Sequence, residues 1–177
     1  TFRFIPGKVI KNSVRLVNNH LLLNIGRADG VEPGMGVVSG SGVIGRVKAV
    51  SQNYSTIYSL LHSQMLVSAK IRRTNTAGTI RWEGDNYRTA TLDYIPRHIK
   101  LVKGDTVVTS GYNAIFPEGI MIGRVLSATQ EQNKMFLTVK VQLAVNFDNL
   151  TFVYVINNTR RAERDALEAR SGIKENE

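Results

Sequence analysis

The most informative part of the sequence is Thr109-Ser110-Gly111, continued after a short interval by Phe116-Pro117-Glu118-Gly119-Ile120-Met121-Ile122-Gly123-Arg124-Val125. This pattern predicts the end of one strand, a glycine-containing loop, a Pro/Gly turn and a second strand. A weaker copy lies earlier, in Glu32-Pro33-Gly34-Met35-Gly36 and Gly42-Val43-Ile44-Gly45-Arg46-Val47. The two Ile-Gly-Arg-Val tetrapeptides begin at Ile44 and Ile122, 78 residues apart. That spacing is too long for a solenoid repeat and predicts two similar small β modules in tandem.

Short β-rich runs recur along most of the chain, separated by turns rich in Gly, Pro, Asn and Asp. The clearest alternation of apolar and polar residues covers 134–143, and the last run, Phe152 to Ile156, is apolar throughout. We expect that last run to be a strand covered on both sides. The pattern gives roughly six strands before Arg72 and six after it. We therefore predict an all-β protein of two small tandem six-stranded β-barrels, since closing a sheet removes its edges.

The predicted domains are a first barrel at 1–73, a second barrel at 74–158 and a polar tail at 159–177. The polar connection at 72–77 is the expected boundary between the barrels. Whether the last strand returns to the first barrel is left open. The tail has charged residues around a few alanines and one leucine, which predicts a short helix with too little apolar surface to be stable alone. We expect it to be frayed or disordered, or to form one end of a partner contact.

Positive charge is concentrated in the first module. The chain carries a formal net charge of +9, and residues 1–73 contain ten Lys and Arg but only Asp29 and Glu32 as acids, a net +8. Such a surface attracts an anionic neighbour, such as lipid headgroups, nucleic acid or an acidic protein face, and it also favours solubility.

The chain has no cysteine, which excludes disulfides and thiolate metal sites. No apolar run approaches the ~18 residues of a membrane helix. Because the chain starts at Thr1, we expect it to be a fragment.

The candidate site residues are structural and belong to the turns and bends of the two modules. We expect glycines here because tight turns, and close approaches between strands, exclude a Cβ atom. Gly119 and Gly123 in particular should resist replacement. We assign no catalytic, cofactor-binding or metal-binding residue. The structural turn motif comprises Gly34, Gly36, Gly45, Gly104, Asp105, Ser110, Gly111, Pro117, Gly119 and Gly123.

Two other classes of function fit parts of the sequence. A chymotrypsin-like serine hydrolase also has twin β-barrels, and Ser110 precedes a glycine, but a triad requires a base and an orienting carboxylate as well. The only histidines are His20, His62 and His98, widely spaced and without paired metal ligands nearby. A nucleic-acid-binding barrel would explain the basic first module, but it requires exposed aromatic residues among the basic ones. We therefore expect neither enzymatic activity nor a nucleic-acid partner.

Several motifs together resemble the extracytoplasmic domain of the rod shape-determining MreC family. The matching pieces are 24–31 with Pro33-Gly34-Met35, then 42–47, 103–111 and 116–123, and the 153–155 ending is also similar. The block at 116–123 is the most specific of them. The resemblance extends over roughly 9–156.

The resemblance implies two small β-barrels that follow a membrane helix and a coiled coil, neither of which is in this chain. It also implies a bacterial scaffold of the elongation complex that faces the periplasm or cell exterior and is anchored in the inner membrane. The implied partners are the transpeptidase penicillin-binding protein 2, MreD, the MreB filament and a second copy of the protein through the coiled coil. The charge of the basic module, rather than the resemblance, adds an anionic membrane surface to the expected neighbours. No catalytic residues and no cofactor come with the family.

Overall fold

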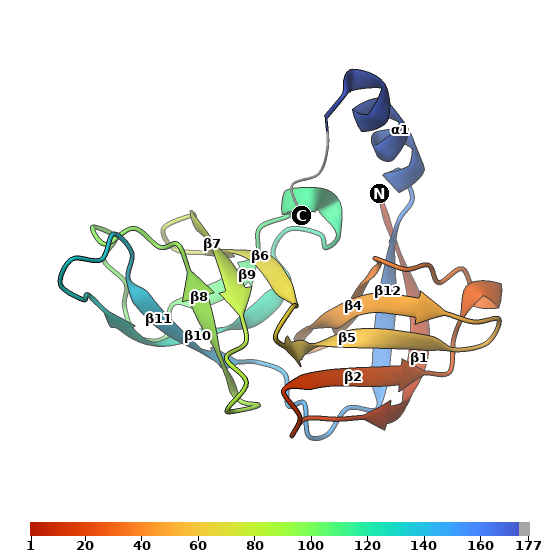
Figure 1. The fold of residues 1–177 in the computed structure, drawn as a ribbon, viewed down its shortest axis with the longest axis horizontal. Helices are drawn as coiled ribbons and strands as arrows, with labels where there is room; N and C mark the ends of the chain where they lie inside the picture. The colour runs from red at the N-terminus through yellow and green to blue at the C-terminus, as the bar shows by residue number, and fades with distance from the viewer. Residues whose placement is uncertain (174–177) are drawn as a thin grey trace.

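The computed structural model describes residues 1–173, which form two closed antiparallel barrels of six strands each (Figure 1). This confirms the predicted all-β class and the two six-stranded barrels. The first barrel contains β1 (Phe2–Asn12), β2 (Asn18–Leu23), β3 (Gly36–Ser39), β4 (Gly42–Val50), β5 (Ser55–His62) and β12 (Phe152–Asn158). The second contains β6 (Leu66–Ile71), β7 (Thr76–Arg81), β8 (Thr89–Asp93), β9 (Thr106–Thr109), β10 (Met121–Thr129) and β11 (Thr138–Leu143).

The boundary between the barrels differs from the one expected at 72–77. Strand β6 pairs with β7 and β9, so it belongs to the second barrel, and the connection between the barrels is 63–65. The polar residues after β6 form the tight β6–β7 turn, in which Asn75 has φ of 56° and donates its N–H to the Ile71 carbonyl. A polar, turn-forming composition therefore marked a hairpin within one barrel rather than a linker between two.

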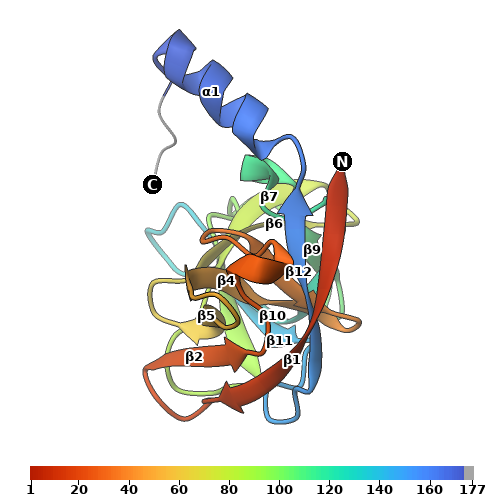
Figure 2. The same cartoon turned by 90° about the vertical axis from the view of Figure 1, so that its right-hand side faces the viewer.

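The last strand returns to the first barrel. Strand β12 pairs with β1 from Phe2↔Asn158 to Lys8↔Phe152, and on its other side it pairs with β3. Figure 2 shows β1 and β12 running side by side along the whole barrel. The first barrel is thus built from both ends of the chain, and the second barrel is inserted between β5 and β12.

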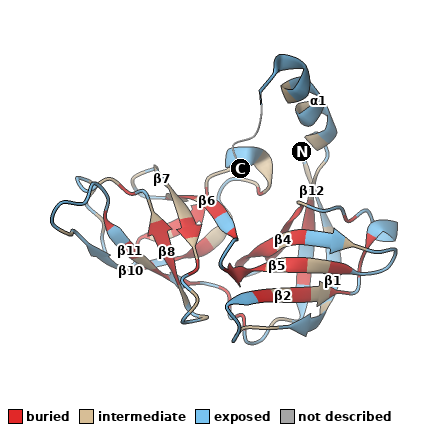
Figure 3. Ribbon diagram, viewed as in Figure 1, coloured by how far each residue is buried: buried red, intermediate tan, exposed pale blue. Residues whose placement is uncertain are grey.

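Buried residues are concentrated in the strands of both barrels, as Figure 3 shows, and in several strands they alternate with less buried ones. In β11, for example, Val139, Val141 and Leu143 are buried and the residues between them are not. This period of two places one row of each strand inside its barrel. The buried apolar residues of both barrels form one continuous cluster that includes Phe116 and Phe147 from the connecting loops. The two barrels therefore share a core at their junction.

The sequence repeat is also a structural repeat. Gly34 and Gly104 each lie two residues before a strand, with φ of 88° and 91°. The N–H of Gly34 donates to the Val47 carbonyl, and the N–H of Gly104 donates to the Val125 carbonyl, both at 2.8 Å. Val47 and Val125 are the valines that end the two Ile-Gly-Arg-Val tetrapeptides. Each glycine turn is therefore fastened to the strand that carries its tetrapeptide.

The polar tail forms helix α1 (Arg161–Ser171), which has no buried residue. Arg161 donates to the Pro33 carbonyl of the first barrel, and Arg164 donates to the Asn113 carbonyl in the short 3-10 turn Tyr112–Ala114 of the second. A second such turn, Arg27–Asp29, follows β2. The helix is thus held by polar contacts to both barrels, although the last part of the predicted tail, 174–177, lies outside the described residues. In 1–173 no helix has the length and apolar character needed to cross a bilayer.

Candidate docking surface

An exposed aromatic strip runs along the outside of the first barrel. It consists of Phe4 on β1 and of Phe152 and Tyr154 on β12, which are 52%, 70% and 43% exposed. Their neighbours Val153 and Val155 point inward and are at most 1% exposed, so the alternation of β12 places the two aromatic rings on the outside. This corrects the prediction that β12 is covered on both sides. The rings of Phe4 and Tyr154 meet edge to face, with centroids 6.4 Å apart.

An apolar groove of about 400 Å³ lies beside the aromatic strip, where the first barrel meets β10 of the second. Val38 contributes to one wall, while Ile120 and Met121 contribute to the other. The barrels come close here because β4 begins with a glycine: a Cβ atom on Gly42 would lie 2.3 Å from the Met121 carbonyl oxygen. Aromatic side chains next to an apolar groove are the usual centre of a protein–protein interface.

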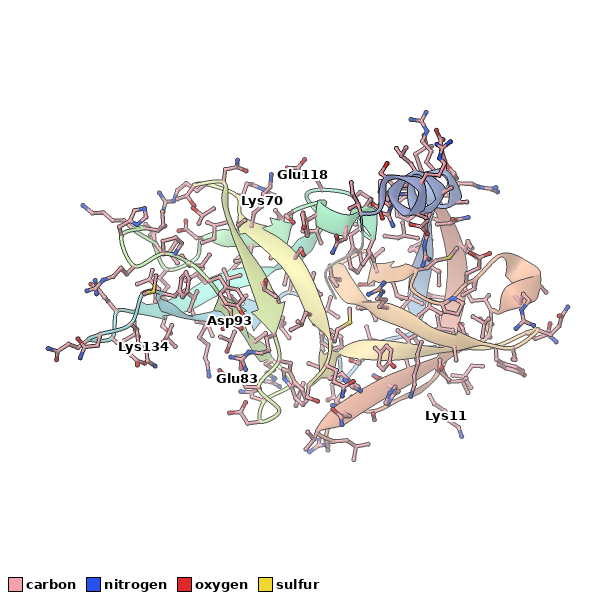
Figure 4. The ribbon with its side chains drawn as sticks, turned by 45° about the horizontal axis from the view of Figure 1, so that its top comes forward. Lys11, Lys70, Glu83, Asp93, Glu118 and Lys134 are labelled. Carbon is pink, nitrogen blue, oxygen red and sulfur yellow. The ribbon has the colours of Figure 1, made fainter. Side chains whose placement is uncertain are left out.

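The charged side chains on the two strands that carry the aromatic strip are all positive. Strand β1 carries Arg3, Lys8 and Lys11, and β12 carries no charged side chain. Within residues 1–173 none of these three cations forms an ion pair. Figure 4 shows Lys11 pointing from β1 into solvent. A partner that covers the strip would therefore gain from acidic groups at its rim.

The predicted turn glycines occupy two kinds of position, and they are distributed over both barrels rather than gathered into one site. Those with positive φ, from 80° to 93°, are Gly34, Gly104, Gly111 and Gly119. Those at which a Cβ atom would come within 3.0 Å of buried or backbone atoms are Gly36, Gly45 and Gly123, whereas at Gly34 the atom within that distance belongs to the Arg161 guanidinium. At Gly36 the neighbour is the Phe116 ring, so this glycine seats the second barrel's loop against the first barrel.

The other predicted residues stabilise the loops around β9. Asp105 accepts two hydrogen bonds from the Arg73 guanidinium, both 2.9 Å long, and one from the Val102 N–H. The Arg73 hydrogen bonds hold the pKa of the Asp105 carboxyl below its ordinary value, against the opposing effect of burial. The Pro117 carbonyl accepts a hydrogen bond from the Thr109 hydroxyl at 2.6 Å. Next to it, Glu118 pairs with Lys70 of β6, and the two side chains point toward one another in Figure 4.

Ser110 has a turn role rather than a catalytic one. Its Oγ accepts a hydrogen bond from the Tyr112 N–H at 3.2 Å, and within 1–173 no histidine is among its hydrogen-bond partners. His20 and His62 lie in the first barrel, on β2 and β5, and Ser110 follows β9 of the second. The arrangement that serine hydrolysis requires is therefore not assembled.

Sequence reasoning missed a cluster of rings on the first barrel. His20, Tyr58 and His62 lie with their ring centroids 5.0 to 5.6 Å apart, and the Lys48 ammonium group lies 5.3 Å from the Tyr58 centroid. Burial, together with the nearby charge of Lys48, lowers the pKa of both histidines from the ordinary value of 6.5. Only strand pairing brings these residues together, so their spacing in the sequence carried no signal.

Comparison with known proteins places this geometry in a family. The family model described as rod shape-determining protein MreC, barrel core, matches residues 9–157. The cell shape-determining protein MreC of Listeria monocytogenes is 30% identical over 159 residues, which cover 88% of this chain and 54% of that protein. This chain spans about half the length of the curated relatives it matches.

Solved structures agree with the fold. A Listeria monocytogenes MreC structure superposes with a TM-score of 0.82 at 28% identity, covering 90% of this chain and 77% of that one. A structure described as a complex between penicillin-binding protein (PBP2) and MreC from Helicobacter pylori has a TM-score of 0.72 at 19% identity, covering 90% of this chain and 99% of that one. With the family model matching most of its length, this chain belongs to the MreC family of cell shape-determining proteins.

Proposed function

We propose that this chain is the docking domain of a non-enzymatic scaffold in the bacterial rod complex, which organises peptidoglycan synthases and so maintains cell shape. The observation that carries the proposal is the aromatic strip of Phe4, Phe152 and Tyr154 beside the apolar groove. A protein that performs no chemistry still has to present such a surface if it is to hold another protein in place. The family is one of cell shape-determining structural proteins, which supports the same reading.

The closed barrel suits this role because it keeps the aromatic strip rigid. Phe152 and Tyr154 project from a strand that is hydrogen bonded on both sides, to β1 and to β3. Their backbone is therefore ordered before a partner arrives, and binding need not supply the entropy of ordering it. Because these side chains are already partly buried, each can contribute about 1–2 kcal/mol when a partner buries the rest of its surface.

The partner we propose for the aromatic strip is penicillin-binding protein 2. A related MreC has been solved in complex with a protein of that name. The strip is an exposed aromatic surface of the first barrel, and its rim of lysines and arginine favours a partner that presents carboxylates around an apolar patch.

Titration of the cognate penicillin-binding protein 2 tests the proposal. We expect Phe152→Ala and Tyr154→Ala each to weaken binding about 10-fold or more, since 1.4 kcal/mol corresponds to one factor of ten. Val102→Ala is the matched control, because Val102 is 58% exposed but belongs to the second barrel. Equal affinities for the wild-type chain and both aromatic variants would remove the strip from the interface, and no binding at all would remove the partner.

We further infer that the domain lies on the periplasmic or extracytoplasmic face and is anchored in the inner membrane by an N-terminal helix outside this chain. One solved relative is described as the major periplasmic domain of MreC, which supports the compartment. Contacts with MreD and MreB, self-association through an N-terminal coiled coil and contact of the basic barrel with anionic lipid belong to the same proposal. Co-purification of the full-length protein from membranes with and without its N-terminal segment tests the anchor.

A further inference from the structure

A second concave surface, the inter-barrel cleft, lies on the other side of the first barrel from the aromatic strip. It has a volume of about 790 Å³, and its walls come from β4 and β5 of the first barrel and from β6 and the 111–116 loop of the second. The strand order around the first barrel is β1-β12-β3-β4-β5-β2, so β4 and β5 lie directly across the barrel from β1 and β12. Figure 1 shows β4 and β5 crossing in front of β12. A partner on the strip therefore leaves the cleft open.

The first barrel's wall of the cleft is cationic and aromatic. Lys48 is exposed, and its ammonium group lies over the Tyr58 ring at 5.3 Å from the centroid. Arg46 lies beside it and donates its Nε–H to the Gly34 carbonyl at 3.0 Å. No Asp or Glu is among the described residues that line the cleft, and within 1–173 Lys48 has no acidic ion-pair partner. The cleft therefore favours an anionic occupant.

The second barrel's wall of the cleft carries two exposed apolar side chains among polar ones. Leu66 is 59% exposed and Tyr112 is 68% exposed, and both line the cleft. Behind them, Met65, Ile115 and Phe116 supply further apolar surface. An aliphatic or aromatic side chain placed against Leu66 and Tyr112 gains by removing apolar area from water.

We propose that the inter-barrel cleft binds an acidic, extended segment of a second partner protein. An apolar side chain of that segment packs against Leu66 and Tyr112, and a neighbouring carboxylate faces Lys48. This site goes beyond the docking of a transpeptidase on the aromatic strip. Because the two surfaces lie across the barrel from one another, one copy of the domain can hold two partners at once.

The ring cluster gives the site a dependence on pH. Tyr58 lines the cleft, and its ring touches both His20 and His62, each with its ring centroid within 5.6 Å. The groups whose charge acts on these histidines are Lys48 on β4 and, for His62, the neighbouring His20. Protonation of either imidazole adds positive charge beside Lys48, whereas the glutamate carboxylates of the ligand, with an ordinary pKa of about 4.3, remain mostly ionised at about pH 5.5. An acidic segment therefore binds more tightly as the pH falls below 6.5.

Fluorescence anisotropy with a labelled peptide of four alternating Glu-Leu pairs tests the proposal on the 177-residue chain. We expect saturable binding below about 100 μM, weakened about 5-fold or more by Lys48→Gln and by Leu66→Ser. Lys103→Gln is the matched control, because Lys103 is an exposed lysine outside the cleft lining. Lowering the pH from about 7.5 to about 5.5 should tighten binding, and His62→Asn should reduce that response.

Three results would overturn the proposal: no saturable binding, equal losses in Lys48→Gln and Lys103→Gln, or displacement of the peptide by a hyaluronan oligosaccharide, an acidic glycan without apolar side chains. Circular dichroism of each variant establishes that it is folded. The Phe152→Ala variant separates this site from the aromatic strip. We expect it to bind the peptide as the wild-type chain does, and a shared loss would show that the two surfaces are one site.

Discussion

The substitution Gly45→Ala adds one methyl group at a place where β4 and β5 leave no room for it. An alanine Cβ at this position would lie 2.0 Å from the Tyr58 carbonyl oxygen and 3.0 Å from its carbonyl carbon. Both are backbone atoms, so no change of rotamer relieves the contact. To reach an ordinary separation the two strands must move apart by more than about 1 Å, although they are paired from Gly45↔Ser59 to Val50↔Ser55.

The expected cost is about 3–5 kcal/mol of unfolding free energy, at or above the upper end for overpacking a core, because the displaced group is a strand and not a side chain. For a chain of this length each kcal/mol lowers the melting temperature by about 2–4 °C. The Gly45→Ala variant should therefore melt roughly 6–20 °C below the wild-type chain. Gly123 occupies the same place in the second barrel, where its Cβ would lie 2.1 Å from the Gln142 carbonyl oxygen, and it should behave alike.

Substitutions at two other glycines distinguish the energetic cost of a close contact from the cost of a strained backbone conformation. Gly40 has nothing within 4 Å of its Cβ position and no left-handed φ, so Gly40→Ala should change stability by no more than about 0.5 kcal/mol. Gly119 has equally open surroundings but φ of 93°, so Gly119→Ala should cost about 1–2 kcal/mol from conformation alone. Thermal and urea unfolding followed by circular dichroism measure all three. Equal melting temperatures for Gly45→Ala and Gly40→Ala would show that the tight strand contact has no energetic weight.

Three further predictions concern titration and the helix. Because the folded-state pKa of His62 is lowered, its stabilising contribution is complete above pH 6.5 and is lost as the pH falls. The melting temperature should therefore fall as the pH is lowered from about 7.5 to about 5. This decrease should be smaller in His62→Asn, and in His98→Asn it should be as large as in the wild-type chain. Asp105 also has a lowered pKa, so the Asp105→Asn variant should melt about 3–6 °C below the wild-type chain at neutral pH. It should also lose less stability than the wild-type chain when the pH is lowered below about 4. An equal loss in the two proteins would refute this role of Asp105. Replacing Arg161 and Arg164 by alanine should speed amide exchange in α1 but not in the barrels, and unchanged rates would show that other contacts hold the helix.

The local features of the fold were predictable from the sequence because they depend on neighbouring residues. Period-two alternation identified most strands, and the repeated tetrapeptides identified two related modules. The assignment of strands to barrels was not predictable, because β12 pairs with a strand at the other end of the chain, and such pairing leaves no local mark. The alternation at 134–143 also extended too far: β11 begins at Thr138, and Met135 is 76% exposed in the preceding loop.

The candidate docking surface was found where sequence reasoning failed. Phe152 to Ile156 has the composition of a strand buried on both faces, yet Phe152 and Tyr154 are exposed. Local rules treat an apolar side chain as a contribution to the core, and they fail at a surface that is apolar for another reason. The ring cluster of His20, Tyr58 and His62 was hidden for a different reason, because it forms only when β2 and β5 pair.

The return of β12 to β1 also has a consequence for biosynthesis. A ribosome releases the second barrel's strands as one uninterrupted block, so that barrel can close as soon as 143 has emerged. The first five strands are made earlier, but until β12 is synthesised β1 and β3 each have one edge without a hydrogen-bonded partner strand. For several seconds at ordinary rates of translation, these open sides can accept a strand from another chain. We therefore expect nascent chains truncated before 152 to aggregate, and chains that extend past 158 to remain soluble.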